Sequence, residues 1–250
     1  MTSPLHGRKT WVVGASSGIG AELARELSRR GADVAISGRR AEELEEVSGG
    51  AMATVPVDVV DAAAVDAATL TVRAALGGLD MVIFSAGYWK QFDATEWDRE
   101  VFARHVEVNL LGFNNVLAAV VPGFVAQGHG NVVGIASVAG YRGLAGSEAY
   151  GATKAAQLNL LEAMRASLSP KGIRVTTVAP GFVRTEMTST NEFPMPFLID
   201  ADEAGRTIAD GLESGDESIV FPKRMALAMG VARLVPGRLW TAVTTRGARK

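Results

Sequence analysis

The chain of 250 residues contains no cysteine, which excludes disulfide frameworks, thiolate metal sites and cysteine nucleophiles. Its three histidines, His6, His105 and His129, do not share metal-ligand spacing, so we expect no zinc site. Neither sign of charge dominates, since 25 Lys and Arg face 27 Asp and Glu, and this balance argues against nucleic-acid binding. There is no apolar run typical of a signal peptide, and no stretch of about 18 apolar residues that suggests a membrane span. We therefore expect a cytoplasmic globular protein.

Short apolar runs alternate with segments of helical periodicity along the chain. The predicted strands are 10–13, 33–37, 51–57, 81–84, 131–136, 174–179 and 218–221, and the predicted helices are 19–30, 42–47, 62–76, 95–107, 108–127, 148–168 and 202–213. Helix-length connections require parallel strand pairing, and continuous Val, Ile and Ala runs are typical of a sheet covered on both faces. The sequence thus predicts an α/β fold, a Rossmann-type doubly wound parallel sheet of about seven strands in three layers, α/β/α.

A glycine-rich turn joins the first predicted strand to the first predicted helix. Its sequence, Gly14-Ala-Ser-Ser-Gly18-Ile-Gly20, has the spacing G-x-x-x-G-x-G. Glycines let the backbone approach a pyrophosphate closely, and a helix N-terminus adds N–H donors and a positive dipole. The turn indicates a dinucleotide site, and a tight loop without a ligand is the alternative interpretation.

The end of the second predicted strand indicates which dinucleotide binds. An acidic residue about 20 positions after the glycines would bind the ribose 2′-hydroxyl of NAD. Here the sequence reads Ser37-Gly38-Arg39-Arg40. An acid would repel a 2′-phosphate, whereas a guanidinium matches it. The sequence therefore favours NADP(H), with a solvated helix start as the alternative interpretation of the two arginines.

Three polar side chains predict acid–base chemistry at a carbonyl oxygen. Tyr150 and Lys154 are four residues apart on a predicted helix and share one face. A nearby ammonium favours phenolate, so we expect the pKa of Tyr150 to be lowered. Ser137 follows the fifth predicted strand, at the carboxyl edge where ligands bind in such sheets. A hydroxyl at that place can donate a hydrogen bond to a substrate oxygen.

With these motifs the chain resembles the single-domain, NADP-preferring branch of the short-chain dehydrogenase/reductase family over residues 8–222. The resemblance implies a catalytic tetrad of Asn109, Ser137, Tyr150 and Lys154, in which Asn109 holds the lysine through water. It also implies a cofactor site without metal, made of Gly14, Ser16, Ser17, Gly18, Ile19, Gly20, Arg39, Arg40, Asp58, Val59, Ser85, Ala86, Gly87, Tyr150, Lys154, Pro180, Gly181, Val183 and Thr185. Within this set, Asp58-Val59 matches the pair that contacts adenine, and Val183 and Thr185 face the nicotinamide carboxamide.

The sequence departs from the family pattern at two places. Phe84-Ser85-Ala86-Gly87 stands where the family has Asn-Asn-Ala-Gly, and Ser17 stands where many NADP-binding members carry Lys or Arg. The first departure puts the tuning of that strand edge in question. The second implies that affinity for the 2′-phosphate rests on Arg39 and Arg40.

The resemblance implies a reversible hydride transfer between nicotinamide and a carbonyl/alcohol pair. We expect an NADP-dependent oxidoreductase that reduces a ketone or aldehyde, or runs in reverse. Segment 186–200 is rich in apolar residues and has no Lys or Arg, so an apolar or lipid-like substrate is expected; Arg142 and Arg184 are the nearby cations that would contradict this. The alternatives are an NADP-binding regulator without turnover and a 3-oxoacyl-thioester reductase, the latter disfavoured because residues 106–141 lack Lys and Arg.

We expect residues 1–222 to form one dinucleotide-binding and catalytic domain, and residues 223–250 to form its C-terminal extension. No acidic residue follows Glu217, whereas seven basic residues do: Lys223, Arg224, Arg233, Arg238, Arg246, Arg249 and Lys250. The extension is predicted either to be a helix packed on the body or a neighbouring subunit, or to touch an anionic membrane surface peripherally. The resemblance implies a homodimer or homotetramer that pairs helices 108–127 and 148–168.

Overall fold

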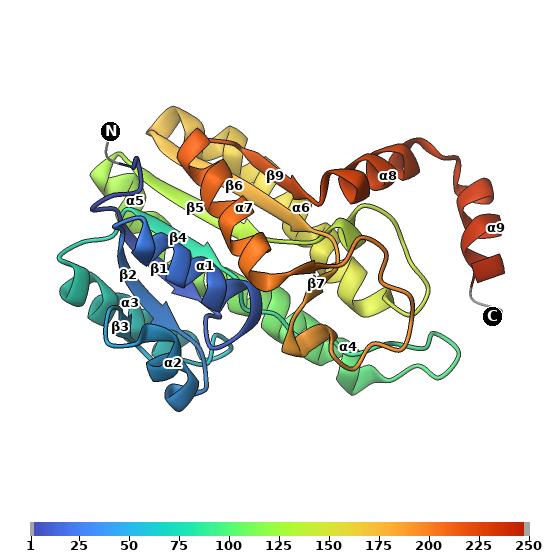
Figure 1. Ribbon diagram of the computed structural model, residues 1–250, viewed down its shortest axis with the longest axis horizontal. Coiled ribbons are helices and arrows are strands. Elements are labelled where there is room, and N and C mark those ends of the chain that lie inside the picture. The colour runs from blue at the N-terminus through green and yellow to red at the C-terminus, as the bar shows by residue number, and fades with distance from the viewer. Residues whose placement is uncertain (1–2, 248–250) are drawn as a thin grey trace.

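The computed structural model describes residues 3–247, with side chains described up to residue 242. A seven-stranded parallel sheet in the order β3-β2-β1-β4-β5-β6-β9 forms the centre of the molecule (Figure 1). Its strands are β1 (Lys9–Val13), β2 (Asp33–Ser37), β3 (Ala53–Thr54), β4 (Met81–Phe84), β5 (Gly130–Ile135), β6 (Ile173–Pro180) and β9 (Ser218–Phe221). This architecture confirms the predicted Rossmann-type α/β fold.

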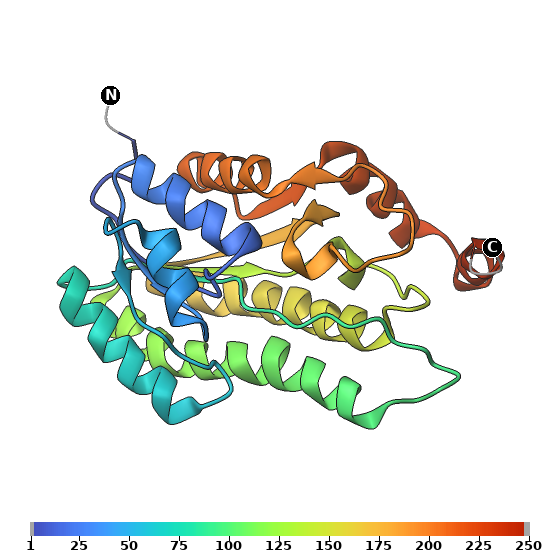
Figure 2. The same cartoon turned by 60° about the horizontal axis from the view of Figure 1, so that its bottom comes forward.

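Helices cover both faces of the sheet (Figure 2). One face is covered by α1 (Gly18–Arg29), α2 (Ala41–Ser48) and α7 (Ala201–Ser214), and the other by α3 (Ala62–Leu76), α5 (Gly112–Gln127) and α6 (Glu148–Leu168). Successive strand residues point to opposite faces, so Val12 packs in the first layer, whereas Trp11 and Val13 pack in the second. Each fully buried aliphatic side chain of these layers contributes about 1.5–3 kcal/mol.

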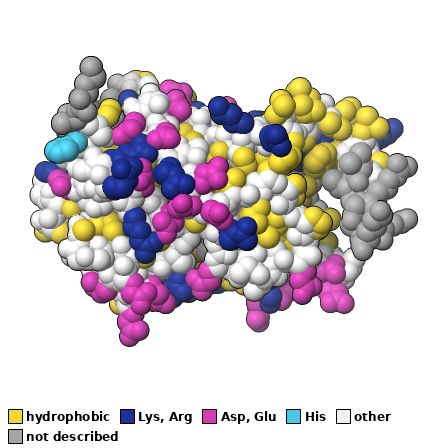
Figure 3. Space-filling view, in the orientation of Figure 1, with side chains coloured by type: hydrophobic (Ala, Val, Ile, Leu, Met, Phe, Trp, Pro, Cys, Tyr) yellow, Lys and Arg dark blue, Asp and Glu magenta, His cyan; other side chains and the backbone are white. Residues whose placement is uncertain are grey.

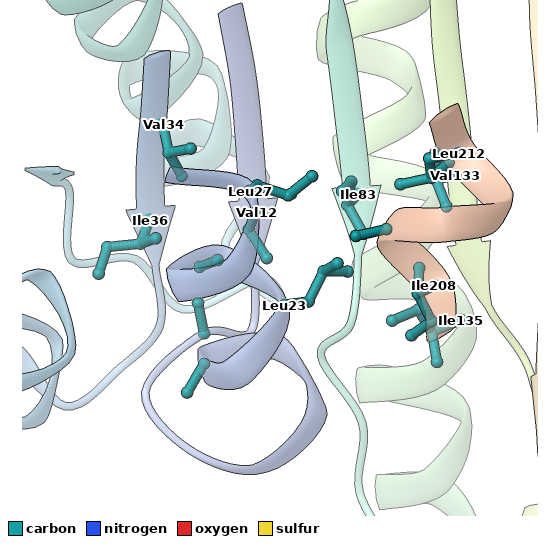
Figure 4. Packing of buried hydrophobic residues seen from close by; sticks show 14 of the residues in the cluster. Val12, Leu23, Leu27, Val34, Ile36, Ile83, Val133, Ile135, Ile208 and Leu212 are labelled. Atoms are coloured by element: carbon teal, nitrogen blue, oxygen red, sulfur yellow. The ribbon is translucent and has the colours of Figure 1, made fainter. Parts of the chain in front are cut away.

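The first helical layer shows how sequence periodicity builds the core. Leu23 and Leu27 of α1 lie one turn apart on its buried face, and Ile208 and Leu212 of α7 have the same spacing. Figure 4 shows these four side chains against Val12, Val34, Ile36, Ile83, Val133 and Ile135 of the sheet. The helices are therefore fixed on the sheet, and the loops at the carboxyl ends of its strands are held in place.

Residues 99–127 form one continuous helix rather than the two predicted ones. It consists of α4 (Arg99–Val106), a π-helical segment η1 (Glu107–Leu111) and α5. It starts at Arg99 and not at residue 95, because the Asp98 side chain accepts hydrogen bonds from the first-turn N–H groups of Glu100 and Val101.

By length and composition alone, this helix is long and apolar enough to cross a membrane, with a mean hydropathy of 1.6 over 18 residues. This differs from the prediction that the chain has no stretch suggesting a membrane span. The helix packs on the sheet through Phe113, Val116, Val120 and Phe124, which are all buried. This packing holds one face of the helix on the sheet.

Two other differences from the prediction concern short strands. Strand β3 covers two residues instead of the predicted 51–57, although the N–H groups of Val55 and Val57 still donate to the Ile36 and Gly38 oxygens beside β2. A two-stranded sheet of β7 (Val183–Arg184) and β8 (Ile199–Asp200) was not predicted. These strands are too short to show periodicity in the sequence. An ion pair of 2.8 Å between Arg184 Nε and Asp200 Oδ1 links the two strands.

The C-terminal extension forms α8 (Lys223–Leu234) and α9 (Gly237–Gly247), which lie at one end of the molecule (Figure 1). Met225, Met229 and Ala232 of α8 are buried in a small cluster of apolar residues. The opposite face of α8 exposes Leu227, Val231 and Leu234, and Figure 3 shows hydrophobic side chains gathered in this region. Of the predicted basic tail, Arg249, Lys250 and the side chain of Arg246 lie outside the described residues, and membrane contact stays a prediction.

Candidate active site

A groove of about 630 Å³ runs along the carboxyl ends of the parallel strands. It is lined by every residue predicted to bind the cofactor and by three of the four predicted tetrad residues, Ser137, Tyr150 and Lys154. Asn109 is fully buried and does not line the groove. The strand order thus gathers into one groove side chains that are far apart in the sequence, and their individual roles remain predictions.

The glycine-rich turn has the geometry of a phosphate cradle. Gly14 and Gly18 have φ of +89° and +61°, which disfavour other residues. A Cβ on Gly14 would lie 2.3 Å from the Ala86 nitrogen, and one on Gly20 would lie 2.1 Å from the Gly14 oxygen. No side chain caps the N-terminus of α1, so its first N–H groups stand at the groove as donors for an anion. These features fit the pyrophosphate of a dinucleotide.

The departure at Ser85 also has a structural account. The Ser85 backbone N–H donates to the Val13 oxygen and continues the β1–β4 ladder past Phe84. The Ser85 hydroxyl oxygen lies 3.0 Å from the place of a Cβ on Gly20, so it fills the space beside the glycine turn. The strand edge is therefore intact with serine at this position.

Arg39 and Arg40 line the groove where β2 ends. A Cβ on Gly38 would lie 3.2 Å from the Ser16 hydroxyl oxygen, so the chain at the end of β2 packs closely against the glycine-rich turn. Arg40 forms an ion pair of 3.0 Å with Glu186, whose pKa this arginine lowers. Sequence reasoning missed Glu186, because 146 residues separate the partners and no motif marks the acid.

Tyr150 lies half-buried in the groove with Lys154 beneath it. The Lys154 Nζ is 5.5 Å from the centre of the Tyr150 ring. Burial raises the pKa of Tyr150 to about 12, while a hydrogen bond with Ser137 acts in the opposite direction. The predicted lowering is therefore wrong for this structure. The reason is that Lys154 is itself buried, which lowers its own pKa to about 7 and weakens the ammonium that was expected to favour phenolate.

Asn109 sits in the π-helical segment η1 and holds the loop after β4. Its Oδ1 accepts a hydrogen bond of 2.7 Å from the Tyr88 N–H, and its Nδ2 donates to the Tyr88 oxygen and the Thr153 hydroxyl. The Asn109 main-chain oxygen accepts a hydrogen bond of 2.7 Å from Gln157 Nε2. The Oε1 of Gln157 in turn accepts a hydrogen bond of 2.9 Å from Lys154 Nζ. Sequence reasoning missed Gln157, although its position three residues after Lys154 places both on one helix face.

Aromatic side chains surround Tyr150. Trp89 meets the Tyr150 ring edge-on, with ring centres 5.2 Å apart, and is held by a hydrogen bond of 2.9 Å from its Nε1 to Asn191 Oδ1. Phe193 also meets Trp89 edge-on, at 6.4 Å between ring centres. Phe92 lies outside this wall and is buried in a separate small core cluster.

Both cations that could have contradicted an apolar pocket are engaged elsewhere. Arg142 donates to the Val235 oxygen and lies over the Trp240 ring, and Arg184 pairs with Asp200. Arg104 does line the groove, and its NH1 is 3.1 Å from a carboxylate oxygen of Glu107. No sequence motif singles out Arg104.

No group of three or more His, Asp or Glu side chains suited to a metal ion occurs within the described part of the chain. His105 is buried beside the aromatic wall, with Nδ1 bonded to the Val101 oxygen and Nε2 accepting from the Lys90 N–H. Burial lowers the pKa of this imidazole, so it is neutral at pH 7. In this setting His105 packs against the Tyr88 ring as a core side chain.

The fold and the groove define a Rossmann-type dinucleotide-binding protein. The sequence model of the short chain dehydrogenase family matches residues 8–194. An uncharacterized oxidoreductase of Myxococcus xanthus is 37% identical over 245 residues, covering 96% of this chain and 97% of that protein. The chain therefore belongs to the short-chain dehydrogenase/reductase family, whose members use NAD(P)(H), and is an oxidoreductase of that family.

Two solved structures illustrate the similarity. A short chain dehydrogenase from Burkholderia cenocepacia J2315 in complex with NADP is 28% identical, with a TM-score of 0.83, and the match covers 96% of this chain and 98% of that one. A single-substitution variant of actinorhodin polyketide ketoreductase with NADPH is 25% identical, with a TM-score of 0.76, over 85% of this chain and 94% of that one.

Proposed function

We propose that this protein is an NADP(H)-dependent carbonyl reductase that interconverts a ketone or aldehyde and its alcohol on an apolar substrate. The observation that carries the proposal is the placement of Tyr150, which faces the groove beside Ser137. Its raised pKa keeps the hydroxyl protonated at neutral pH. A protonated phenol is the state that a proton donor requires in the reductive direction.

The chain's own groups supply the acid–base part of the reaction. The bound nicotinamide supplies or accepts the hydride. Ser137 and Tyr150 hold the substrate oxygen by hydrogen bonds, and these bonds strengthen as negative charge develops on that oxygen. Tyr150 then donates its Oη proton to the oxygen, and the Lys154 amino group beneath the ring favours the resulting phenolate in the fraction of molecules in which it is protonated.

The preference for NADP(H) rests on the end of β2. Arg39 and Arg40 stand at the groove, and Gly38 stands where an acid would repel a 2′-phosphate. Among the described residues Arg39 forms no ion pair, so its guanidinium is available to a phosphate. Structures of two family relatives contain NADP or NADPH, which supports the same cofactor here.

An apolar, ring-sized substrate is supported by the side chains around Tyr150. Trp89 and Met187 line the groove, and Phe193 backs Trp89. The two cations that the sequence placed near this wall, Arg142 and Arg184, are bound to other groups. An anionic substrate would need a cationic clamp in this wall, whereas a flat apolar ketone would stack on its rings.

An assay of NADPH and NADH oxidation against a ketone panel tests the proposal. The panel contains aromatic ketones, long-chain 3-oxo esters, steroid-like ketones and carboxylate-bearing ketones of matched size. We expect turnover with NADPH on the neutral apolar members, lost in Tyr150→Phe. Tight NADPH binding without turnover would support the alternative of an NADP-binding regulator. Preference for 3-oxo thioesters would support the thioester reductase, and preference for carboxylates would contradict the apolar pocket.

We also propose that the protein assembles through α5 and α6 into a dimer or tetramer. Exposed apolar side chains lie on these elements or at their start, namely Leu111, Val125 and Leu160. Burial of such side chains in a helix–helix interface is favourable. Light scattering after size exclusion should give at least twice the chain mass of 26.2 kDa, and substitution of Val125 and Leu160 by Glu should lower it.

A further inference from the structure

Gln157 is a buried polar residue of α6 next to the proposed active site. Its side chain is 1% exposed and lies three residues after Lys154. Both ends of its amide are used: Oε1 accepts from Lys154 Nζ at 2.9 Å, and Nε2 donates to the Asn109 main-chain oxygen at 2.7 Å. One side chain thus joins α6 directly to the π-helical segment η1 and at the same time holds the amino group of Lys154.

The surroundings explain why an amide is needed at this place. Asn109 lies in η1, where the N–H of Gly112 donates to the Glu107 oxygen five residues back, so the helix is locally widened. Burying a polar amide is costly unless both its ends are hydrogen-bonded. An apolar side chain would fill the same space but would leave the Asn109 oxygen and the Lys154 amino group each without this partner.

The bond to Gln157 also sets the direction of the Lys154 amino group. A lysine ammonium carries three N–H donors. One is directed to the Ile135 main-chain oxygen at 2.8 Å and one to Gln157 Oε1. The third is left for the groove that Lys154 lines, on the side where Tyr150 stands.

We propose that Gln157 is a positioning residue of the active site: its amide, anchored on the Asn109 carbonyl, holds the Lys154 amino group and aims the remaining N–H into the groove. Its catalytic consequence rests on the proposed function, whereas the effect on Lys154 does not. The two neutral oxygens that accept hydrogen bonds from Lys154, those of Ile135 and Gln157, stabilise its ammonium form more than its free amine form. Gln157 therefore opposes the burial that lowers the pKa of Lys154.

Few other titratable groups act on this amino group in the described part of the chain. From α6 itself Tyr150 faces it, with its ring 5.5 Å from Nζ. From α4 the neutral His105 lies behind Tyr150, at 6.4 Å between ring centres. The elements β5 and η1 present main-chain oxygens, of Ile135 and Asn109. A change at residue 157 is thus the most direct way to alter the charge state of Lys154.

The pKa of Lys154 can be measured by NMR titration of lysine Cε signals, without any substrate. The chain has six lysines, so the spectrum is small, and Lys154→Arg identifies the signal. We expect Gln157→Met to lower the pKa of Lys154 by about one unit, because one hydrogen bond to a charged group is lost. Gln157→Glu should raise it, since a carboxylate favours the ammonium.

A matched control is available in Gln127. This side chain of α5 also donates through Nε2 to main-chain oxygens, those of Leu79 and His129, but far along the chain from Lys154. Gln127→Met should leave the Lys154 titration unchanged. If Gln157→Met also leaves it unchanged, Gln157 only fills space and the proposal is wrong. If Gln157→Met does not fold, as judged by circular dichroism, the absence of a rise in Gln157→Glu decides against the proposal in the same way.

Kinetics then test the consequence for the reaction. On the alkaline side, where Lys154 loses its proton, the midpoint of the pH profile of kcat/KM should move about one unit lower in Gln157→Met, giving about tenfold lower activity above that midpoint and little change well below it. A uniform loss at all pH values would indicate a purely structural effect. An altered Lys154 titration in a protein that reduces no carbonyl would support the positioning role and contradict the proposed function.

Discussion

The two ends of the groove are built in different ways. The cofactor end is made of backbone: the turn at Gly14 and Gly20 lets strand ends approach within contact distance, and rigid helices hold it on the sheet. The substrate end is made of side chains on irregular segments, with Trp89 fixed by a hydrogen bond to Asn191. The difference teaches that the cofactor site is determined by the fold itself, whereas the substrate wall can change by substitution of a few loop residues.

The largest expected effect separates chemistry from cofactor binding. Tyr150→Phe removes the proton donor but keeps the ring against Trp89. General acid catalysis contributes on the order of 10²–10⁴-fold, so kcat should fall by about 10³. The Kd for NADPH, measured by fluorescence, should change by less than about twofold. A variant that keeps most of its turnover would show that another group supplies the proton.

A substitution at the glycine turn should break the cofactor end while leaving the wall intact. In Gly20→Val the new Cβ would stand 2.1 Å from the Gly14 oxygen, a contact that backbone must move to relieve. We expect loss of NADPH binding and a stability lower by about 1–3 kcal/mol, measured by urea denaturation. Gly230→Ala is the control, since nothing lies within 4 Å of a Cβ there. Normal binding in Gly20→Val would mean that the turn does not form the cradle.

The pH dependence of stability reports on the buried lysine between the two ends. Burial lowers the pKa of Lys154 from an ordinary 10.5 to about 7, so between these values the unfolded chain binds more protons than the folded one. Stability should therefore rise with pH across this window, with a limit of about 1.4 kcal/mol per pH unit for one proton. Lys154→Met should remove that part of the slope in urea titrations at pH 7 to 9. An equal slope in both proteins would show that Lys154 is not buried as a neutral amine.

The assignment of Trp89 to the substrate wall is tested by comparing substitutions of two tryptophans. Trp89→Ala removes a ring that lines the groove, and we expect KM for an aromatic ketone to rise about tenfold, in line with about 0.5–1.5 kcal/mol for an aromatic pair. KM for a small aliphatic ketone should change little. Trp97 is 61% exposed and packs on Phe92 and Phe102, away from the groove, so Trp97→Ala is the matched control. Equal effects of both variants would remove Trp89 from the wall.

The smallest expected effect concerns the contact that joins the two ends. Glu186, from the segment after β7, pairs with Arg40 and competes with a 2′-phosphate for its guanidinium. Glu186→Gln should bind NADPH about threefold more tightly, as expected for an exposed ion pair, and NADH unchanged. Arg40→Ala should have the opposite effect on NADPH. If neither variant alters the ratio of the two affinities, Arg39 alone reads the phosphate.

The sequence was sufficient for the sheet and for the groove that it creates. Strands such as Met81–Phe84 and helices such as Ala62–Leu76 have the predicted bounds, because periodicity and flanking glycines are local signals. Motif spacing likewise brought Gly14, Ser137 and Tyr150 to one groove, because parallel strands end at the same edge.

What the sequence did not show depends on long-range contacts. The pairing of Arg40 with Glu186 and the buried bridge through Gln157 join residues without any shared motif. The pKa of Tyr150 was predicted in the wrong direction because burial, which the sequence does not display, outweighs the charge of a lysine that is itself buried. The short strands β7 and β8 were missed since two residues carry no periodicity.

Deuterium transfer tests the central claim most directly. The protein is incubated with NADPH labelled with deuterium at one or the other C4 position, together with the neutral apolar ketones, and the alcohols are examined by mass spectrometry. The account predicts deuterium on the carbinol carbon from one of the two labelled cofactors and none from the other, with the transfer lost in Tyr150→Phe. Tight NADPH binding with no deuterium in any alcohol would contradict it.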